Sequence, residues 1–224
     1  LAAEQPSGEA KAIASQTITL DGPDWKIATD PDNKGRDEKW FDASRAEAKP
    51  ATVPCTMQEI FPGSSGLAWY WKEFTAPANP HAGGRCLLRF WAVDYKADVW
   101  LNGKPVGTHL DAEEPFTLDA TEAIRPGNNL LVVRVLNPAG NPIDGLTRGN
   151  TVPGFKNGVP GGGWNFGGIL DSVELLVAPA VRLEDLHLIT DWKSGGITAH
   201  ANIRNAGAGK TRVRLILSVA PAVG

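Results

Sequence analysis

Short apolar runs separated by glycine and proline dominate this chain, and no helical period continues beyond about two turns. The 25 glycines and 17 prolines of the 224 residues stand between the runs, where they favour turns. Within residues 85–91, Cys86, Leu88 and Phe90 alternate with residues of the opposite face, which is the period-two pattern of a strand. The sequence therefore predicts an all-β sandwich or barrel rather than an α/β fold.

Several local patterns refine this prediction. The clearest expected strands are residues 69–75, 85–92, 97–101, 129–136 and 170–178. Asn102-Gly103 lies between two apolar runs and predicts a type I′ hairpin, because both central residues of that turn take positive φ. Most of the eight tryptophans fall in strand-like phrases and are expected in the core. Trp71 and Trp100 are out of phase with their apolar neighbours, so we expect these two to be more exposed.

Charge and apolar content limit the classes of partner. The net charge is -3, and no basic face indicates nucleic acid. No stretch reaches the roughly 18–20 apolar residues that a membrane-spanning helix needs. Residues 1–16 are polar and Ala-rich without a strong period, which indicates a processed or flexible N-terminal tail and favours a secreted or periplasmic protein. We therefore expect neither nucleic acid nor membrane among the partners.

The pattern changes near residue 180. Ala178-Pro179-Ala180 resembles a linker, and three strand-like segments follow it at 181–190, 196–205 and 211–219. Three strands are fewer than the roughly seven of a complete sandwich, so residues 180–224 are predicted to form an incomplete second domain. An incomplete sheet has an open edge, which we expect to dock on the first domain or to pair with a second copy in a homo-oligomer.

The chain offers few groups for metal or cofactor chemistry, and we expect neither a metal nor a cofactor. Cys55 and Cys86 are interpreted as two small buried residues, with a disulfide between them as the alternative. The acidic stretch 111–114 indicates a solvated loop, and a calcium site there is a less favoured alternative. Asp94, Tyr95 and Asp98 are expected to hold the sheet and its corner together rather than to contact a substrate.

A set of phrases in a fixed order resembles the front part of glycoside hydrolase family 2, which contains β-galactosidases, β-glucuronidases and β-mannosidases. The phrases are residues 21–27, 35–41, 53–55, 66–74, 88–104, 124–135 and 165–169, the last of which reads Asn165-Phe166-Gly167-Gly168-Ile169. Each phrase is weak alone, and their order and spacing across residues 20 to 205 carry the resemblance.

The resemblance implies an order of domains. A galactose-binding-like jelly-roll β-sandwich would span 17–179, a partial immunoglobulin-like β-sandwich would span 180–224, and a catalytic (β/α)₈ barrel with two glutamates would follow. A retaining glycosidase needs two carboxylates about 5–5.5 Å apart, and no such pair is evident in this sequence. We therefore expect no catalytic residue here and predict that the chain alone is inactive, as the non-catalytic part of a glycosidase.

The Gly-rich segment 154–168 is the candidate carbohydrate-binding loop. It fits neither a dinucleotide nor a P-loop pattern, and it is longer than a plain sandwich connection. Its polar and aromatic members Lys156, Asn157, Trp164 and Asn165 suit a sugar, because an aromatic face stacks on the ring and amides bond the hydroxyls. The alternative is that Trp164 and Phe166 fold back and pin the loop.

Three functions remain open at this level. The first is a domain that supports the barrel of a family 2 enzyme and lends a loop to its carbohydrate site. The second is an independent carbohydrate-binding module, and the third is a surface adhesion domain built of sandwiches. The family phrases disfavour the third. The expected partners are a carbohydrate and the chain's own downstream barrel.

Overall fold

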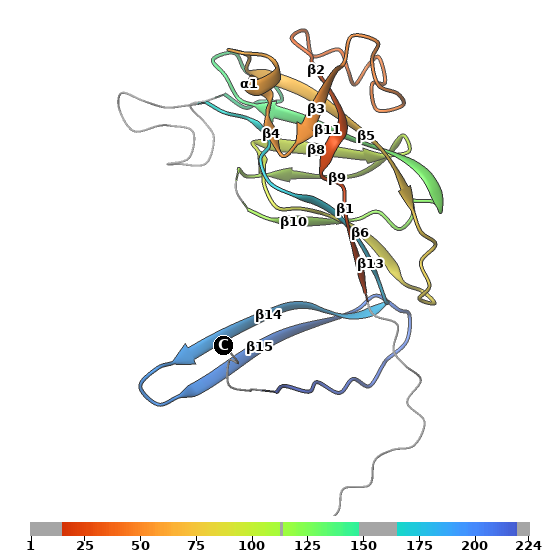
Figure 1. Ribbon diagram of the computed structural model, residues 1–224, viewed down its shortest axis with the longest axis vertical. Coiled ribbons are helices and arrows are strands. Elements are labelled where there is room, and N and C mark those ends of the chain that lie inside the picture. Colours follow the sequence, from red (N-terminus) through yellow and green to blue (C-terminus); the bar gives the residue numbers. More distant parts are fainter. Residues whose placement is uncertain (1–14, 113, 148–164, 219–224) are drawn as a thin grey trace, which may run out of the picture.

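Two packed β-sheets form the main body of the protein, and a separate β-hairpin extends from one end of it (Figure 1). The computed structural model describes residues 15–112, 114–147 and 165–218. The larger sheet has six strands in the order β3-β2-β5-β11-β8-β9. Their bounds are β2 (Gly22–Thr29), β3 (Lys49–Val53), β5 (Gly66–Ala76), β8 (Lys96–Leu101), β9 (Lys104–Leu110) and β11 (Gly127–Asn137).

The smaller sheet has four strands in the order β1-β13-β6-β10. They are β1 (Gln16–Thr19), β6 (Arg85–Phe90), β10 (Phe116–Asp119) and β13 (Val173–Ala178). A short sheet closes one end of the sandwich with β4 (Cys55–Thr56), β7 (Val93–Asp94) and β12 (Gly168–Ile169), beside the single-turn helix α1 (Met57–Ile60). The strand pairs of the main sheets are antiparallel throughout, so the all-β prediction is confirmed.

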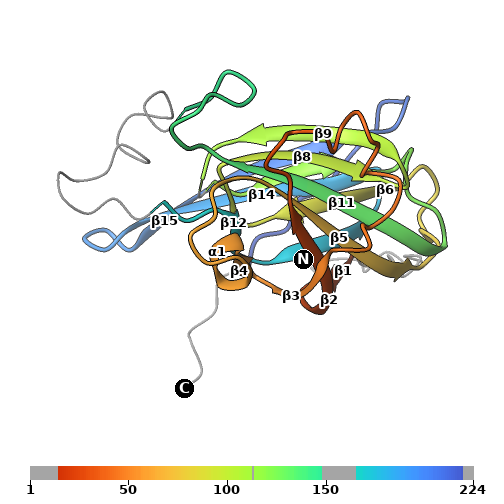
Figure 2. The same ribbon diagram turned by 90° about the horizontal axis from the view of Figure 1, so that it is seen from above.

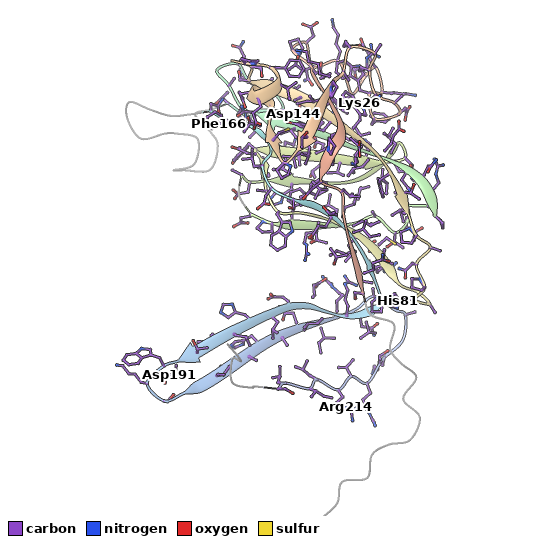
Figure 3. The ribbon with its side chains drawn as sticks, in the orientation of Figure 1. Lys26, His81, Asp144, Phe166, Asp191 and Arg214 are labelled. Atoms are coloured by element: carbon purple, nitrogen blue, oxygen red, sulfur yellow. The ribbon has the colours of Figure 1, made fainter. Side chains whose placement is uncertain are left out.

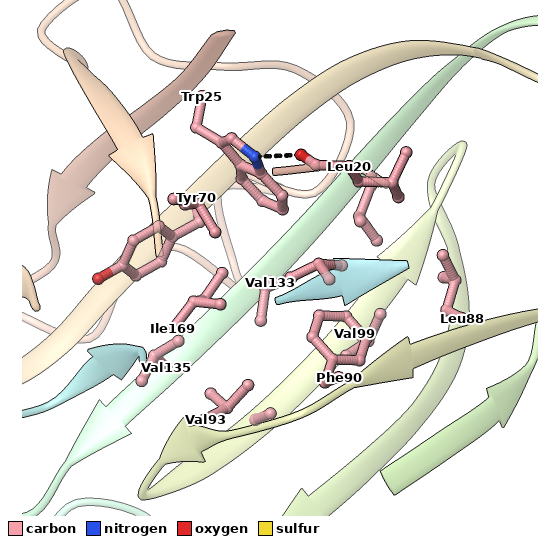
Figure 4. Close-up of a cluster of buried hydrophobic side chains, with 14 of the residues drawn as sticks. Leu20, Trp25, Tyr70, Leu88, Phe90, Val93, Val99, Val133, Val135 and Ile169 are labelled. Carbon is pink, nitrogen blue, oxygen red and sulfur yellow. Dashed lines mark hydrogen bonds between the residues drawn. The ribbon is translucent and has the colours of Figure 1, made fainter. Parts of the chain in front are cut away.

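The core lies between the two large sheets (Figure 4). Alternate residues of each strand point inward, among them Phe90, Val99 and Val133, and all three are buried. Trp25 is also buried, and its indole Nε1–H donates to the Leu20 carbonyl at 2.8 Å. This bond satisfies the polar end of a large side chain that would otherwise lose a hydrogen bond on burial.

The outer face of the six-stranded sheet is buried as well, because residues 30–48 cross over it (Figure 2). Trp69 and Trp71 of β5 project to this face and pack against Trp40 of the covering segment. Trp71 is only 2 % exposed and donates to the Trp40 carbonyl at 2.7 Å. The expectation that Trp71 is exposed was wrong, since its out-of-phase position marks a second buried face. Trp100 lies at the edge of the same cluster and is half-buried.

The turn between β8 and β9 confirms the hairpin prediction. Asn102 has φ 53° and Gly103 has φ 77°, the two positive values that a type I′ turn requires. The Asn102 amide also reaches across the sheet: it donates to the Ala123 carbonyl at 2.9 Å, and its oxygen accepts the Leu130 N–H at 3.0 Å. One residue thus sets the turn and joins it to the neighbouring strand.

The two cysteines are not bonded to each other, which decides between the two alternatives left open by the sequence. Cys55 and Cys86 are both free and buried. Burial, together with the nearby Glu59 charge, raises the pKa of the Cys55 thiol to about 11. Both residues therefore act as small apolar side chains.

The last part of the described chain forms the hairpin of β14 (Val181–Asp191) and β15 (Gly196–Asn205). Two of the three segments expected after residue 180 are therefore strands. Residues 211–218 of the third form no strand, and that prediction was wrong for them because no strand edge pairs with their backbone. Among the described residues, no helix is long and apolar enough to cross a membrane.

Candidate carbohydrate site

The end of the sandwich that carries α1, β4 and β12 holds the described part of the predicted loop. Gln58 of α1 ties this end together: its Nε2 donates to the Asn165 carbonyl at 3.2 Å and to the Ser64 carbonyl at 2.8 Å. Its Oε1 accepts the Gly167 N–H at 3.2 Å, and the Met57 N–H donates to the Gly167 carbonyl at 2.7 Å. The Gln58 side chain and this backbone bond thus help to hold the chain that enters β12.

Asn165 is the one predicted sugar-binding residue that the structure describes. Its Nδ2 donates to the Pro138 carbonyl at 3.0 Å, and its own carbonyl accepts from the fully buried Asn137 side chain at 3.1 Å. The residue is half-buried and links the segment before β12 to the end of β11. Lys156, Asn157 and Trp164 lie outside the described residues.

Two consecutive glycines let the chain pass close to the sheet at this point. Gly168 has φ 152°, and a Cβ on it would lie 2.5 Å from the Cys55 carbonyl oxygen and 2.9 Å from the Tyr70 hydroxyl. A Cβ on Gly167 would overlap the Asn137 side chain. The Gly-Gly pair in the family phrase is therefore required by close approach of backbones.

Phe166, beside Asn165, is 46 % exposed (Figure 3). The alternative in which Trp164 and Phe166 together pin the loop involves Trp164, which lies outside the described residues. The hydrogen bonds of Gln58, Asn137 and Asn165 hold the segment before β12. Gln58 and Asn137 were missed by sequence reasoning, and the one available signal was that Asn137 ends a long apolar run as a polar residue before proline.

A network of charged side chains holds the chain on the other side of the loop, in residues 138–147. Asp144 lies at its centre: its Oδ2 accepts from Arg134 at 2.8 Å and from Lys96 at 3.1 Å, and its Oδ1 accepts from Arg36 at 3.0 Å. Asp98, expected from the sequence to stabilise the sheet, accepts from Arg134 at 2.8 Å and from Arg36 at 2.6 Å. The segment that leads into residues 148–164 is thereby fastened to β8 and β11.

The electrostatics of this network favour the ionised carboxylate. Burial alone would raise the pKa of Asp144, but the hydrogen bond and charge of Arg134 outweigh it, with help from Lys96 and Arg36, and hold the pKa well below its ordinary value. Arg134 is itself fully buried, and its Nη2 donates to Asn33 at 2.9 Å. A buried guanidinium needs such partners because an unpaired charge in the interior is costly.

The described residues show little that could hold a metal. Within residues 15–112, 114–147 and 165–218, no cluster of three or more His, Cys, Asp or Glu side chains is arranged for a metal ion. In the acidic stretch 111–114, the Asp111 carboxylate accepts the Ala112 N–H at 2.6 Å, which is a local bond to the next residue.

Comparison with known proteins identifies the family to which the sandwich belongs. A model of the family described as "Glycosyl hydrolases family 2, sugar binding domain" matches residues 18–179. The chain belongs to glycosyl hydrolase family 2. The family resemblance predicted from the ordered phrases is therefore confirmed.

Relatives within family 2 include enzymes of two named activities. A β-glucuronidase of Paenibacillus borealis is 27% identical over 211 residues, which cover 86% of this chain and 34% of that protein. A β-galactosidase of Yersinia pestis is 26% identical over 196 residues, which cover 78% of this chain and 17% of that protein. The chain thus spans about a third or less of the length of these relatives.

Solved structures agree with the fold. A β-glucuronidase of an uncultured Clostridium sp. superposes with a TM-score of 0.69 at 27% identity, covering 87% of this chain and 35% of that one. The β-glucuronidase of Ruminococcus gnavus superposes with a TM-score of 0.70 at 21% identity, covering 87% and 34%. At that identity the second likeness concerns the fold alone.

Proposed function

We propose that this chain is the non-catalytic front part of a family 2 glycoside hydrolase, in which it supports a (β/α)₈ catalytic barrel. The observation that carries the proposal is the family match over residues 18–179, joined to relatives that are much longer than this chain. The relatives named above act on β-glucuronides or β-galactosides by their names, and we extend β-glycoside hydrolysis as a reaction class to the whole protein.

In this proposal, the chain also lends the loop 154–168 to the rim of the carbohydrate site. The chain is held on both sides of residues 148–164, by Asp144 before them and by Asn165 with Gln58 after them. Anchored ends restrict the positions that a loop can reach, which lowers the entropy lost when it contacts a ligand.

The reaction class is tested by comparing this chain with the full-length gene product that contains it. Both are assayed on a panel of nitrophenyl β-glycosides that includes the glucuronide and the galactoside. We expect turnover by the full-length protein and none by the chain alone. Turnover by the repurified chain that disappears when one of its acidic residues is replaced would contradict a supporting role. Titration of the chain with oligosaccharides checks the alternative of an independent module, which would bind in the micromolar to millimolar range.

The role of the loop is tested in the full-length protein with Asn165→Ala. If the amide also meets a sugar hydroxyl, we expect a loss of about 1–3 kcal/mol of transition-state binding, or roughly 5- to 150-fold in kcat/KM. Gln58→Leu is the matched control, because it removes hydrogen bonds that hold the same segment without removing Asn165. An equal loss in both variants would show that Asn165 acts only by holding the segment. No loss in either would remove the loop from the site.

A further inference from the structure

A cleft of about 420 Å³ lies where the hairpin meets the sandwich. Residues of the four-stranded sheet line one side of the cleft, and residues near the base of β14 and β15 line the other. The Arg85 side chain of β6 links the two parts, since its Nη2 donates to the Ala206 carbonyl at 2.9 Å. The Ala206 N–H donates to the Ala180 carbonyl at 2.8 Å and closes the base of the hairpin. The volume lies within the range of small-molecule sites.

Three guanidinium groups line this cleft from both walls. Arg89 comes from the sandwich, and Arg182 and Arg204 come from the two strands of the hairpin. Arg89 is neutralised by Glu174, to which its Nε donates at 2.7 Å. Arg182 and Arg204 share the single carboxylate of Glu184, at 3.0 and 3.1 Å. The hairpin wall therefore carries one positive charge more than its carboxylate balances.

The Arg182 side chain also has an unused donor. It is only 12 % exposed, and its terminal Nη1 is buried without a hydrogen-bond partner among the described residues. A buried charged donor that makes no bond costs free energy, so such a group calls for a partner. The planar guanidinium matches the oxygens of a carboxylate, sulfate or phosphate group, which accept two parallel N–H bonds.

We propose that this cleft binds a sugar-sized anion through a carboxylate or sulfate group held by Arg182 and Arg204. The other wall fits the body of such a ligand, since Leu87 and Leu176 supply apolar surface and Thr117 supplies a hydroxyl. The proposal does not depend on the proposed hydrolase activity, because it uses only residues of the junction.

The test is a calorimetric titration of the whole chain with sodium glucuronate and with sodium sulfate, with glucose and sodium chloride as neutral and ionic-strength controls. We expect saturable binding with a Kd on the order of 1 mM for an anion and none for glucose. Equal affinity for both anions would show that the cleft recognises the charged group alone. Higher affinity for glucuronate would show that the sugar ring also contributes to binding. Absence of saturable binding to both anions would overturn the proposal.

Two charge-removing variants and one control localise the binding. Arg182→Gln is expected to weaken anion binding at least tenfold, and Lys193→Gln, which removes the same charge at the far tip of the hairpin, is expected to leave it unchanged. If Arg182→Gln does not fold cooperatively, Arg204→Gln replaces it in the test, because Arg204 is more exposed. Arg204→Gln is also expected to weaken anion binding. Binding that stays equal to wild type in the folded arginine variants, or that falls as much in Lys193→Gln, would overturn the assignment to this cleft.

Discussion

The six-stranded sheet and the β14–β15 hairpin use the same alternating pattern and reach opposite degrees of burial. In the sheet, β5 and β11 are buried on both faces, because the second sheet covers one and residues 30–48 cover the other. In the hairpin, Leu186 and Leu188 face the same side as Ala201 and Ala199 across the register, and both leucines are exposed. Alternation therefore predicts a strand, while burial depends on what packs against it.

The hairpin also shows what an uncovered sheet retains. Its polar side pairs His187 with His200, and its turn at residues 191–196 is closed by Asp191, which accepts from Ser194 at 2.5 Å. Local pairing and turn bonds are present, yet its apolar side chains contribute little because water still reaches them. An isolated two-stranded hairpin is marginal in water, so we expect its stability to depend on its neighbours.

The largest expected effect is the loss of Trp69 from the covered outer face. Trp69 is fully buried, stacks on Trp100 at 5.3 Å and donates to Asp30 at 3.0 Å. Trp69→Ala should lower the free energy of unfolding by about 3–5 kcal/mol, measured by urea denaturation. Trp192→Ala is the hairpin control: Trp192 is 86 % exposed, and we expect a change within about 0.5 kcal/mol. Similar losses in both variants would contradict the difference between the two regions.

A smaller effect is expected from the charged network that holds residues 138–147. Asp144→Asn removes one carboxylate from the buried Arg134 and should cost about 3 kcal/mol at neutral pH. The folded-state pKa of Asp144 lies below its ordinary value of 3.8, so its contribution is present above about pH 4 and is lost as the pH falls below that value.

Urea denaturation of wild type and Asp144→Asn between pH 7 and pH 2 tests this direction of the pH dependence of stability. The difference in unfolding free energy should be constant above about pH 5 and shrink toward acid pH. Asp32→Asn is the control, since Asp32 pairs with Lys34 on the surface and should change stability by less than about 1 kcal/mol. A difference that grows on acidification would contradict the assigned direction of the pKa shift.

The smallest of the three effects concerns one glycine at the end of the sandwich and one that follows the hairpin. Gly168→Ala introduces a Cβ at φ 152° against the Cys55 carbonyl, and we expect a loss of about 1–3 kcal/mol in thermal or urea unfolding. Gly209→Ala lies after the hairpin, where a Cβ meets nothing within 4 Å, and should be nearly neutral. If Gly168→Ala is tolerated as well as Gly209→Ala, close approach does not explain the glycine pair before β12.

Structural features that depend only on residues close together in the sequence could be predicted without the structure. The inward alternation of Cys86, Leu88 and Phe90 and the turn at Asn102-Gly103 follow from side-chain period and local φ preference. The candidate loop was located by its glycines, whereas its anchors were not. Gln58 and Asn165 are 107 residues apart, and no local signal places the amide of one beside the carbonyl of the other.

The sequence by itself determined the all-β class, the main strands, the hairpin turn and the family, because these depend on short-range periodicity and on the order of the phrases. Only the tertiary structure decided which faces are covered and which charges meet. Trp71 is buried because residues 30–48 happen to cross its sheet, and Arg36 meets Asp144 from 108 positions away. Burial and charge pairing depend on distances in space, and a one-dimensional pattern carries those distances only within a turn or a strand.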